Sequence, residues 1–328
     1  MSSPSTTSAV TRPDLKNRVY RDWDLRRQRA GFVANLAAPL CDVELARATI
    51  KRIDAREILK DPDDSRAAGG GYNRGEFRLT EISYDTVERG LEQPIDRSKS
   101  AELGGYMNCE REAADIVLYQ AHAKHEKRVA DLMQTAGSYG ALTGAVNGVN
   151  WTKHTTADPI DDVQRVILAL KEASGYTPNS VVIPWKAWNH MIRCANVLDR
   201  LGSGGAGTDP KIVTRAAVAK LLDLPETGII VPDAYRATSN PGATLALGSI
   251  WDVDKVVVGY IDSNPDPSSR TLAVSYHWTG DGSQRDFAVE TYYEEAVRAD
   301  VVRARRHVAA VLRDSALGYL LTTVLTKA

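Results

Sequence analysis

Three side chains on one predicted helix have the types and spacing that could hold a metal ion. His122, His125 and Glu126 stand at positions i, i+3 and i+4, so they would share one helix face, and imidazole and carboxylate groups are common zinc ligands. The order HxxHE differs from the HExxH and HxxEH patterns of zinc enzymes, and a charged helix face produces such triplets by chance. We therefore expect no metal site, with a metal-dependent enzyme as an alternative.

A glycine-rich segment from Gly202 to Gly207 matches the GxGxxG pattern. That pattern binds pyrophosphate where a buried strand ends and a helix begins. Here it follows a predicted helix that ends near Leu201, with no buried strand before it, so we expect an exposed surface loop. The sequence contains no GxSxG or GxxxxGK[ST] motif. We thus predict no catalytic residue and no cofactor, with a nucleotide-dependent enzyme as the other enzymatic alternative.

Length and composition indicate an ordinary folded protein with more than one core. The chain has 328 residues, of which 43% are hydrophobic and 25% charged, and a chain of this size usually divides into lobes. Its formal net charge of −1 argues against a dedicated nucleic-acid-binding protein, which would carry a basic excess. Cys41, Cys109 and Cys194 show no paired spacing, so we expect reduced thiols. No stretch is long and apolar enough for a signal peptide or membrane span, and we expect a cytosolic product.

The segment from Gly75 to Gly105 is predicted to form two extended strands with charge at nearly every second position. Such a ribbon cannot build a core of its own, and an isolated two-stranded hairpin is marginally stable in water. We therefore expect it to lie against something outside itself, and the elements that follow point to another copy of this chain.

The elements after the ribbon are predicted from caps and hydrophobic spacing. Cys109 to Gln134 reads as one helix of roughly 40 Å, apolar mainly at its two ends, so its middle is expected to face solvent or a neighbour. Asp158-Pro159 places an N-cap residue before a first-turn proline, which begins a helix to about Ala173. Short β-branched runs then alternate with helices, and Phe287 to Val308 shows the alternation of long antiparallel strands whose arginines point outward.

This succession resembles the major capsid proteins of tailed bacteriophages. The resemblance rests on the ribbon ending in Gln93-Pro94-Ile95-Asp96, the long helix, the segment Gly148-Val149-Asn150-Trp151, the Asp158-Pro159 helix and the strand Pro178 to Pro184. It covers roughly Val43 to Leu325. The fold it implies is the α+β HK97-like capsid fold, with an N-terminal arm, an extended β-hairpin called the E-loop, a peripheral P-domain with a long spine helix, and an axial α/β A-domain.

The resemblance also implies how the chain divides. The expected segments are an N-terminal arm (1–42), a first P-domain segment (43–69), the E-loop (70–106), the spine-helix region (107–151), the A-domain (152–286), P-domain return strands (287–310) and a C-terminal A-domain segment (311–328).

In this family identical copies form hexamers and pentamers of an icosahedral shell, and the E-loop of one subunit lies over the P-domain of the next. The implied contact residues are Arg74, Glu76, Arg78, Glu81, Glu88, Arg89, Glu92, Asp96, Arg97 and Lys99. The N-terminal arm mixes basic, acidic and aromatic residues. It reads either as a solvated surface segment or as an arm along neighbouring subunits, with contacts from Trp23, Arg26, Arg27 and Phe32.

The implied function is therefore a shell around double-stranded phage DNA, built in the host cytoplasm and found in the virion. Other implied partners are a separate scaffolding protein, a portal and a decoration protein, with non-specific contact to DNA and no membrane. An encapsulin-type cellular compartment has the same fold and is the main alternative.

Overall fold

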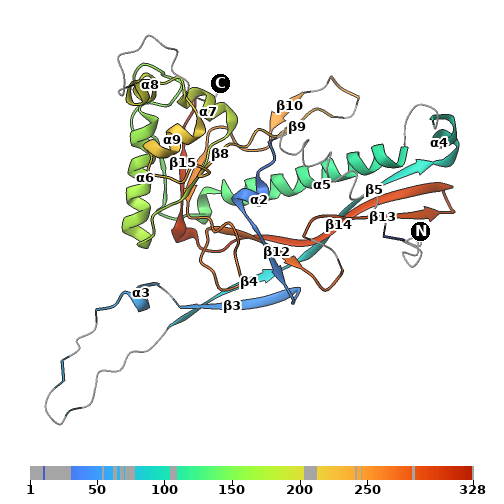
Figure 1. Cartoon of the computed structure of the whole chain (residues 1–328), viewed down its shortest axis with the longest axis horizontal. Helices are drawn as coiled ribbons and strands as arrows, with labels where there is room; N and C mark the ends of the chain where they lie inside the picture. Colours follow the sequence, from blue (N-terminus) through green and yellow to red (C-terminus); the bar gives the residue numbers. More distant parts are fainter. Residues whose placement is uncertain are drawn as a thin grey trace.

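The computed structural model describes residues 10–11, 31–53, 55–61, 65–66, 70, 78–103, 109–202, 213–240, 242–244, 246–282 and 285–326. Within this part of the chain, two β-sheets form two lobes joined beside the end of a long helix, and a two-stranded ribbon projects from the first lobe (Figure 1). The chain crosses between the lobes more than once, because strands from both halves of the sequence enter each sheet.

The first lobe is built on a six-stranded sheet whose long central strand is β14 (Ala299–Leu312). Antiparallel partners lie on both sides of β14, and a parallel strand closes one edge. The remaining strands are β1 (Val10–Thr11), β13 (Ala288–Glu294), β12 (Ala273–Trp278), β2 (Leu40–Val43) and β5 (Val87–Asp96).

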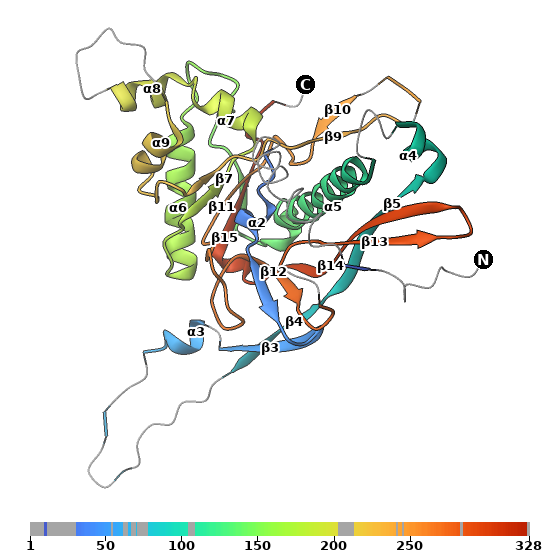
Figure 2. The same cartoon turned by 45° about the vertical axis from the view of Figure 1, so that its right-hand side comes forward.

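Helix α5 (Cys109–Met133) covers one face of this sheet, as Figure 2 shows. Its predicted bounds are confirmed. The prediction that its middle faces solvent or a neighbour is wrong, since His122, His125 and Glu126 are all buried. The cause is the segment just before and within α2 (Ala34–Ala37), which packs across the middle of α5 and covers it.

The ribbon consists of β3 (Arg47–Ile53) and β4 (Leu79–Asp85), paired in register from Arg47–Asp85 to Ile53–Leu79, with α3 (Ala55–Ile58) beyond β3. The prediction of two strands pairing with each other within 75–105 is wrong. Its second strand, β5, pairs with β14 instead. The reason is hydrophobic: Leu91 and Ile95 on β5 pack into the core beneath α5 and draw this strand into the sheet.

The second lobe is a five-stranded sheet in the order β6-β15-β11-β7-β8, flanked by helices. Its main helix, α6 (Pro159–Ser174), has the predicted cap, because the Asp158 side chain accepts a hydrogen bond from the Asp161 N–H, and it ends at Gly175 with φ of 73°. The other elements are β6 (Thr143–Ala145), β7 (Ser180–Val182), β8 (Ile229–Ile230), β11 (Val256–Gly259), β15 (Gly318–Thr322), α7 (Trp185–Met191), α8 (Ala195–Gly202) and α9 (Arg215–Leu221).

Three smaller elements complete the described chain: α4 (Arg97–Leu103) follows β5, and β9 (Tyr235–Ala237) pairs with β10 (Leu247–Ser249) as an exposed hairpin. Short 3-10 turns occur at Ala136–Ser138 and Ser315–Leu317. Within the described residues, no helix is both long and apolar enough to cross a membrane.

Two expectations about strand placement differ from the structure. The sequence predicts β12 in the second lobe, but this strand pairs with β14 and β2 in the first. There Val274 and Tyr276 belong to the small core that buries the base of the ribbon. The arginines of β14 were expected to point outward. Arg306 is instead completely buried, with its guanidinium 4.6 Å from the centre of the Phe287 ring.

Candidate assembly surface

The ribbon has one face packed against its own lobe and one face open. The side chains of Ala48, Ile50 and Tyr84 point inward and contact a small core around Cys41, Val43, Val274 and Tyr276. Alternation along a strand sends the intervening residues to the other face. That outer face carries an ion pair between Arg47 and Asp85, and at its far end the exposed pair Ile53 and Leu79.

The root of the ribbon is fixed by aromatic packing. The rings of Tyr84 and Tyr276 are stacked, and the Tyr84 hydroxyl donates a hydrogen bond to the carbonyl of Leu45. Burial raises the pKa of both phenols, to about 12 for Tyr276, so both stay neutral at ordinary pH. The ribbon therefore leaves the lobe in a fixed direction.

The predicted contact residues fall into two groups in the structure. Arg78 and Glu81 lie exposed on the ribbon, where a neighbouring molecule can reach them. Arg74 and Glu76 lie outside the described residues.

The second group lies on β5 and α4, bound into the first lobe, and several of its members contact their own chain. Glu92 pairs with Arg303 and accepts a hydrogen bond from the Tyr292 hydroxyl, and Arg97 makes two hydrogen bonds to Asp300. Glu88 lies 3.8 Å from the Arg305 guanidinium, and Asp96 accepts a hydrogen bond from the Ser98 N–H at the start of α4. Lys99 lies in α4, and its side chain is not among those described.

Arg89 occupies the opposite face of β5 from Glu92, on the side of α5. Its charge acts on Arg128 of that helix. Burial, and then the neighbouring positive charge of Arg89, lower the pKa of Arg128 to about 10. Arg89 is still exposed, so this like-charge pair lies at the edge of the lobe.

The predicted arm contacts Trp23, Arg26 and Arg27 lie outside the described residues. Phe32, the fourth, is buried within its own chain, with its ring 5.4 Å from that of Tyr119 on α5. Phe32 thus packs against α5 near the start of the described segment 31–53, and we call the contact of residues 32–34 with α5 the junction.

Glu126, considered above as a metal ligand, holds this junction. Its carboxylate is 1% exposed and accepts hydrogen bonds from the backbone N–H groups of Val33 and Ala34 and from the indole of Trp251, the last at 2.6 Å. The described residues contain no group of three or more metal-ligating side chains. The nearby His122 instead lies 3.3 Å from Asp286 and edge-on to the ring of Phe287. Glu126 thus serves as a structural acceptor. Sequence reasoning missed this role, since its donors lie far away in the chain.

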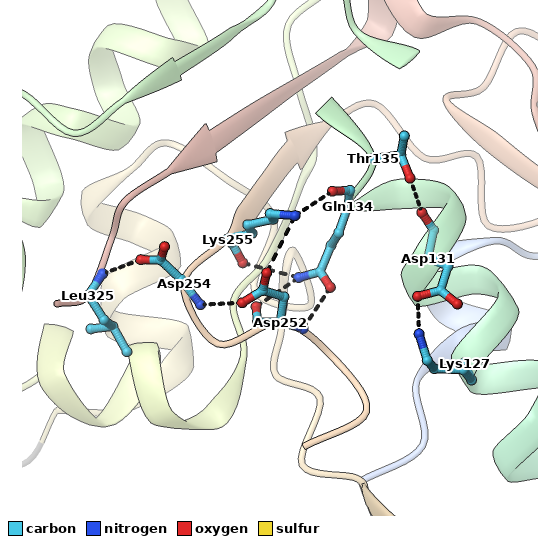
Figure 3. Close-up of polar contacts among 8 residues, drawn as sticks. All are labelled: Lys127, Asp131, Gln134, Thr135, Asp252, Asp254, Lys255 and Leu325. Atoms are coloured by element: carbon cyan, nitrogen blue, oxygen red, sulfur yellow. Dashed lines mark hydrogen bonds and ion pairs between the residues drawn. The ribbon is translucent and has the colours of Figure 1, made fainter. Parts of the chain in front are cut away.

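A second polar cluster joins the end of α5 to the second lobe (Figure 3). The Gln134 amide donates to the carbonyl of Asp252 and accepts from the Asp252 N–H, while the Lys255 ammonium bonds to the carbonyl of Gln134. On the other side of this loop, Asp254 accepts a hydrogen bond from the N–H of Leu325. One loop therefore holds the end of α5 and the segment that follows β15 together.

Two histidines that showed no pattern in the sequence meet in the second lobe. His154 Nε2 and His190 Nδ1 are 2.9 Å apart, so one nitrogen donates and the other accepts. Burial, and then the charges of His154, Arg193 and Lys186, lower the pKa of His190. The neighbouring Cys194 is buried, and burial raises its pKa to about 11, so the thiol is unreactive.

The expectation that the cysteines are reduced thiols agrees with the structure. Cys41, Cys109 and Cys194 are free; the first and last are buried, and Cys109 is half-buried. The glycine-rich pattern begins at Gly202, the last residue of α8, and its continuation at 203–207 lies outside the described residues.

Comparison with solved structures finds the same arrangement across almost the whole chain. A phage-related protein from Bordetella bronchiseptica is similar with a TM-score of 0.70 at 19% identity, covering 97% of this chain and 99% of that one. The mature capsid of bacteriophage PhiM1 is similar with a TM-score of 0.54 at 13% identity, covering 86% and 85%. The chain has the HK97-like capsid fold.

The same fold occurs in an encapsulin. The SrpI encapsulin of Synechococcus elongatus is similar with a TM-score of 0.53 at 10% identity, covering 98% of this chain and 92% of that one. Comparison of the sequence with protein-family models and with curated proteins gives no match. We call the six-stranded sheet with α5 the P-domain, the five-stranded sheet the A-domain, and the β3–β4 ribbon the E-loop.

Proposed function

We propose that this chain is the major capsid protein of a tailed bacteriophage, which self-assembles into hexamers and pentamers of an icosahedral shell around double-stranded DNA. The observation that carries the proposal is a projecting ribbon whose outer face, among the described residues, is exposed at Ile53 and Leu79, on a fold shared with a phage-related protein over 97% of this chain and with a phage capsid over 86% of it. A two-stranded ribbon with an open apolar end gains stability when a second surface covers it.

The proposed mechanism is assembly by many weak contacts. The E-loop of one subunit lies over the P-domain of the next, with Arg78 and Glu81 available on its surface. Exposed ion pairs contribute about 0 to 1 kcal/mol each, so repetition and shape must supply most of the stability. Glu88, Arg89, Glu92, Asp96, Arg97 and Lys99 would act from β5 and α4, as parts of the P-domain that receives the ribbon.

The proposed role is structural, without catalysis or cofactor. The product would be found in the virion after assembly in the host cytoplasm. Its further partners would be a scaffolding protein, a portal and a decoration protein, with non-specific contact to packaged DNA. The near-neutral charge of the chain agrees with a container that does not bind DNA tightly.

The test is negative-stain electron microscopy of the purified chain, alone and with any co-encoded scaffolding protein. Uniform shells or capsomers are the expected result. A well-folded monomer under every condition would overturn the proposal.

An encapsulin-type compartment is the second candidate, because the SrpI structure is similar over almost all of both chains. Shells purified from the native source decide between the two. Nuclease-protected DNA inside them supports the capsid, and a protein cargo without DNA supports the compartment.

A further inference from the structure

A groove of about 1270 Å³ separates the outer half of the E-loop ribbon and the end of α3 from the A-domain. One wall is aliphatic and comes from the ribbon and α3, with Ile50, Ile82, Ile58 and Leu59. The other wall comes from the end of α6 (172–176) and from the segments 267–270 and 313–316. Ile58 and Leu59 are 67% and 72% exposed, an unusual degree for adjacent aliphatic residues, and this marks an interaction surface.

The groove is also basic. Its lining has an excess of cationic side chains over the acidic Glu172 and Asp314; the cationic ones are Lys51, Arg52, Lys60, Arg270 and Arg313. Asp314 is already neutralised by Arg52 at 2.9 Å and Arg270 at 2.8 Å. Lys60 forms an ion pair with Glu57 at the rim of the groove. When Glu57 is counted as well, the basic side chains around the groove still outnumber the acidic ones. The groove therefore favours a partner segment that is both apolar and acidic.

The turn between β13 and β14 has an exposed valine and a small acidic excess, since Glu294 and Glu295 outnumber the exposed Arg298. Glu294 and Glu295 precede Ala296 and Val297, and Val297 is 53% exposed. The turn is narrow, because only residues 295–298 separate the paired ends of the two strands, with Arg298 at φ of 50° closing it. We call residues 294–297 the acidic knob.

The acidic knob and the groove lie at opposite ends of the molecule. Figures 1 and 2 both show the joined ends of β13 and β14 on one side and α3 beside the foot of α6 on the other. A chain with complementary surfaces at its two ends associates head to tail, so each copy can use both surfaces at once, and the contact propagates into rings or shells.

We propose that the acidic knob of one copy docks in the groove of another copy. Val297 then covers Ile58 and Leu59, and Glu294 and Glu295 approach Lys51 and Lys60. This inference rests on the proposed function, because it requires self-assembly. It adds a specific contact between the tip of the P-domain sheet and the groove beside the outer half of the E-loop.

Charge reversal tests the contact without touching either core. The double variant Glu294→Lys with Glu295→Lys, and the double variant Lys51→Glu with Lys60→Glu, should each lower the yield of sedimenting shells at least tenfold. The chain that combines all four substitutions should recover most of the yield, because the complementary charges are restored with opposite sign. Wild-type yield from both double variants would overturn the contact and leave the capsid proposal standing.

Cysteine cross-linking gives a second readout that does not depend on charge. Val297→Cys and Leu59→Cys are prepared as separate proteins, co-assembled and oxidised. A disulfide-linked dimer in the mixture, absent from either protein alone, is expected on a non-reducing gel. Shells that form without this dimer would overturn the contact, whereas a wild-type chain that forms no assembly at all would overturn the proposed function with it.

Discussion

The ring of Tyr84 on the E-loop stacks on the ring of Tyr276 in the P-domain sheet, with centroids 4.2 Å apart and planes inclined by 20°. Tyr84 comes from the projecting strand β4 and Tyr276 from β12, so this stack is the main aromatic contact between the ribbon and the lobe that carries it. A ribbon held at its root in this way can present its outer face to a neighbour at a defined angle.

Tyr84→Ala should therefore weaken both the fold and the direction of the E-loop. We expect the free energy of unfolding to fall by roughly 3 kcal/mol, measured by urea denaturation, because a buried aromatic ring is removed. Tyr84→Phe is the matched control: it keeps the ring and loses only the hydrogen bond to Leu45, at a cost of about 1 kcal/mol. Equal losses in the two variants would show that the stack contributes nothing.

Arg78→Ala combined with Glu81→Ala should affect assembly and leave the monomer intact. Both side chains are exposed on the ribbon, so the free energy of unfolding should change by less than about 0.5 kcal/mol. Shell yield, measured by sedimentation and electron microscopy, should drop if the E-loop covers a neighbour. Glu92→Ala is the contrasting variant, since it removes an own-chain pair with Arg303 and should lower stability by up to about 1 kcal/mol. An unchanged shell yield from the first variant would contradict a role of these residues in subunit contact.

Glu126→Ala should detach the root of the N-terminal arm from α5. The substitution leaves the N–H groups of Val33 and Ala34 and the Trp251 indole buried without their acceptor, at about 1 to 3 kcal/mol for each unsatisfied group. Glu126→Gln retains one carbonyl oxygen and should cost less. Denaturation curves compare the two variants, and protection of the Val33 and Ala34 amides from hydrogen exchange reports the junction directly. Undiminished protection in Glu126→Ala would be evidence against this role.

Gly31→Ala and Gly175→Ala form a matched pair, because both glycines have φ of 73°. At Gly175 a Cβ atom would meet nothing within 4 Å, so alanine should cost only the left-handed backbone, about 1 to 2 kcal/mol. At Gly31 the same atom would lie 2.5 Å from the backbone nitrogen of Asp233, so a further loss is expected. Thermal unfolding should place Gly31→Ala below Gly175→Ala, and the reverse order would contradict the close approach.

Local sequence signals predicted the helices, because the backbone hydrogen bonds of a helix join residues that are close in the sequence. The cap at Asp158, the first-turn Pro159 and the terminal Gly175 define α6 without help from distant chain, and the long helix α5 was equally plain. Pairing of strands depends on distant partners. Charge alternation along 79–96 was compatible with a hairpin, but only the core beneath α5 decides that β5 joins β14.

In the candidate assembly surface, too, some features follow from the local sequence and others depend on distant contacts. Exposed charges on the E-loop were predictable from composition, since a ribbon without a core must present polar side chains to solvent or to a partner. The role of Glu126 was not predictable, because its donors Val33 and Trp251 lie on segments that only the folded chain brings together. The meeting of His154 with His190 is hidden in the sequence for the same reason.

That histidine pair makes stability depend on pH. The pKa of His190 is lowered in the folded chain, chiefly by burial, so the folded state binds fewer protons than the unfolded state near pH 6. Its contribution to stability is fully present above the unfolded pKa of about 6.5 and is lost as the pH falls from there through the folded pKa. Wild-type protein should therefore lose stability as the pH falls below about 6.5 into the acidic range.

His190→Gln should flatten this dependence, since glutamine cannot take up the proton. His154→Gln should give an intermediate slope: it removes the second imidazole, while burial, the larger cause of the lowered pKa, remains. Urea denaturation of the three proteins at several pH values in this range measures the slopes. If His190→Gln loses stability on acidification as steeply as the wild type, the half-buried histidine pair does not govern acid sensitivity.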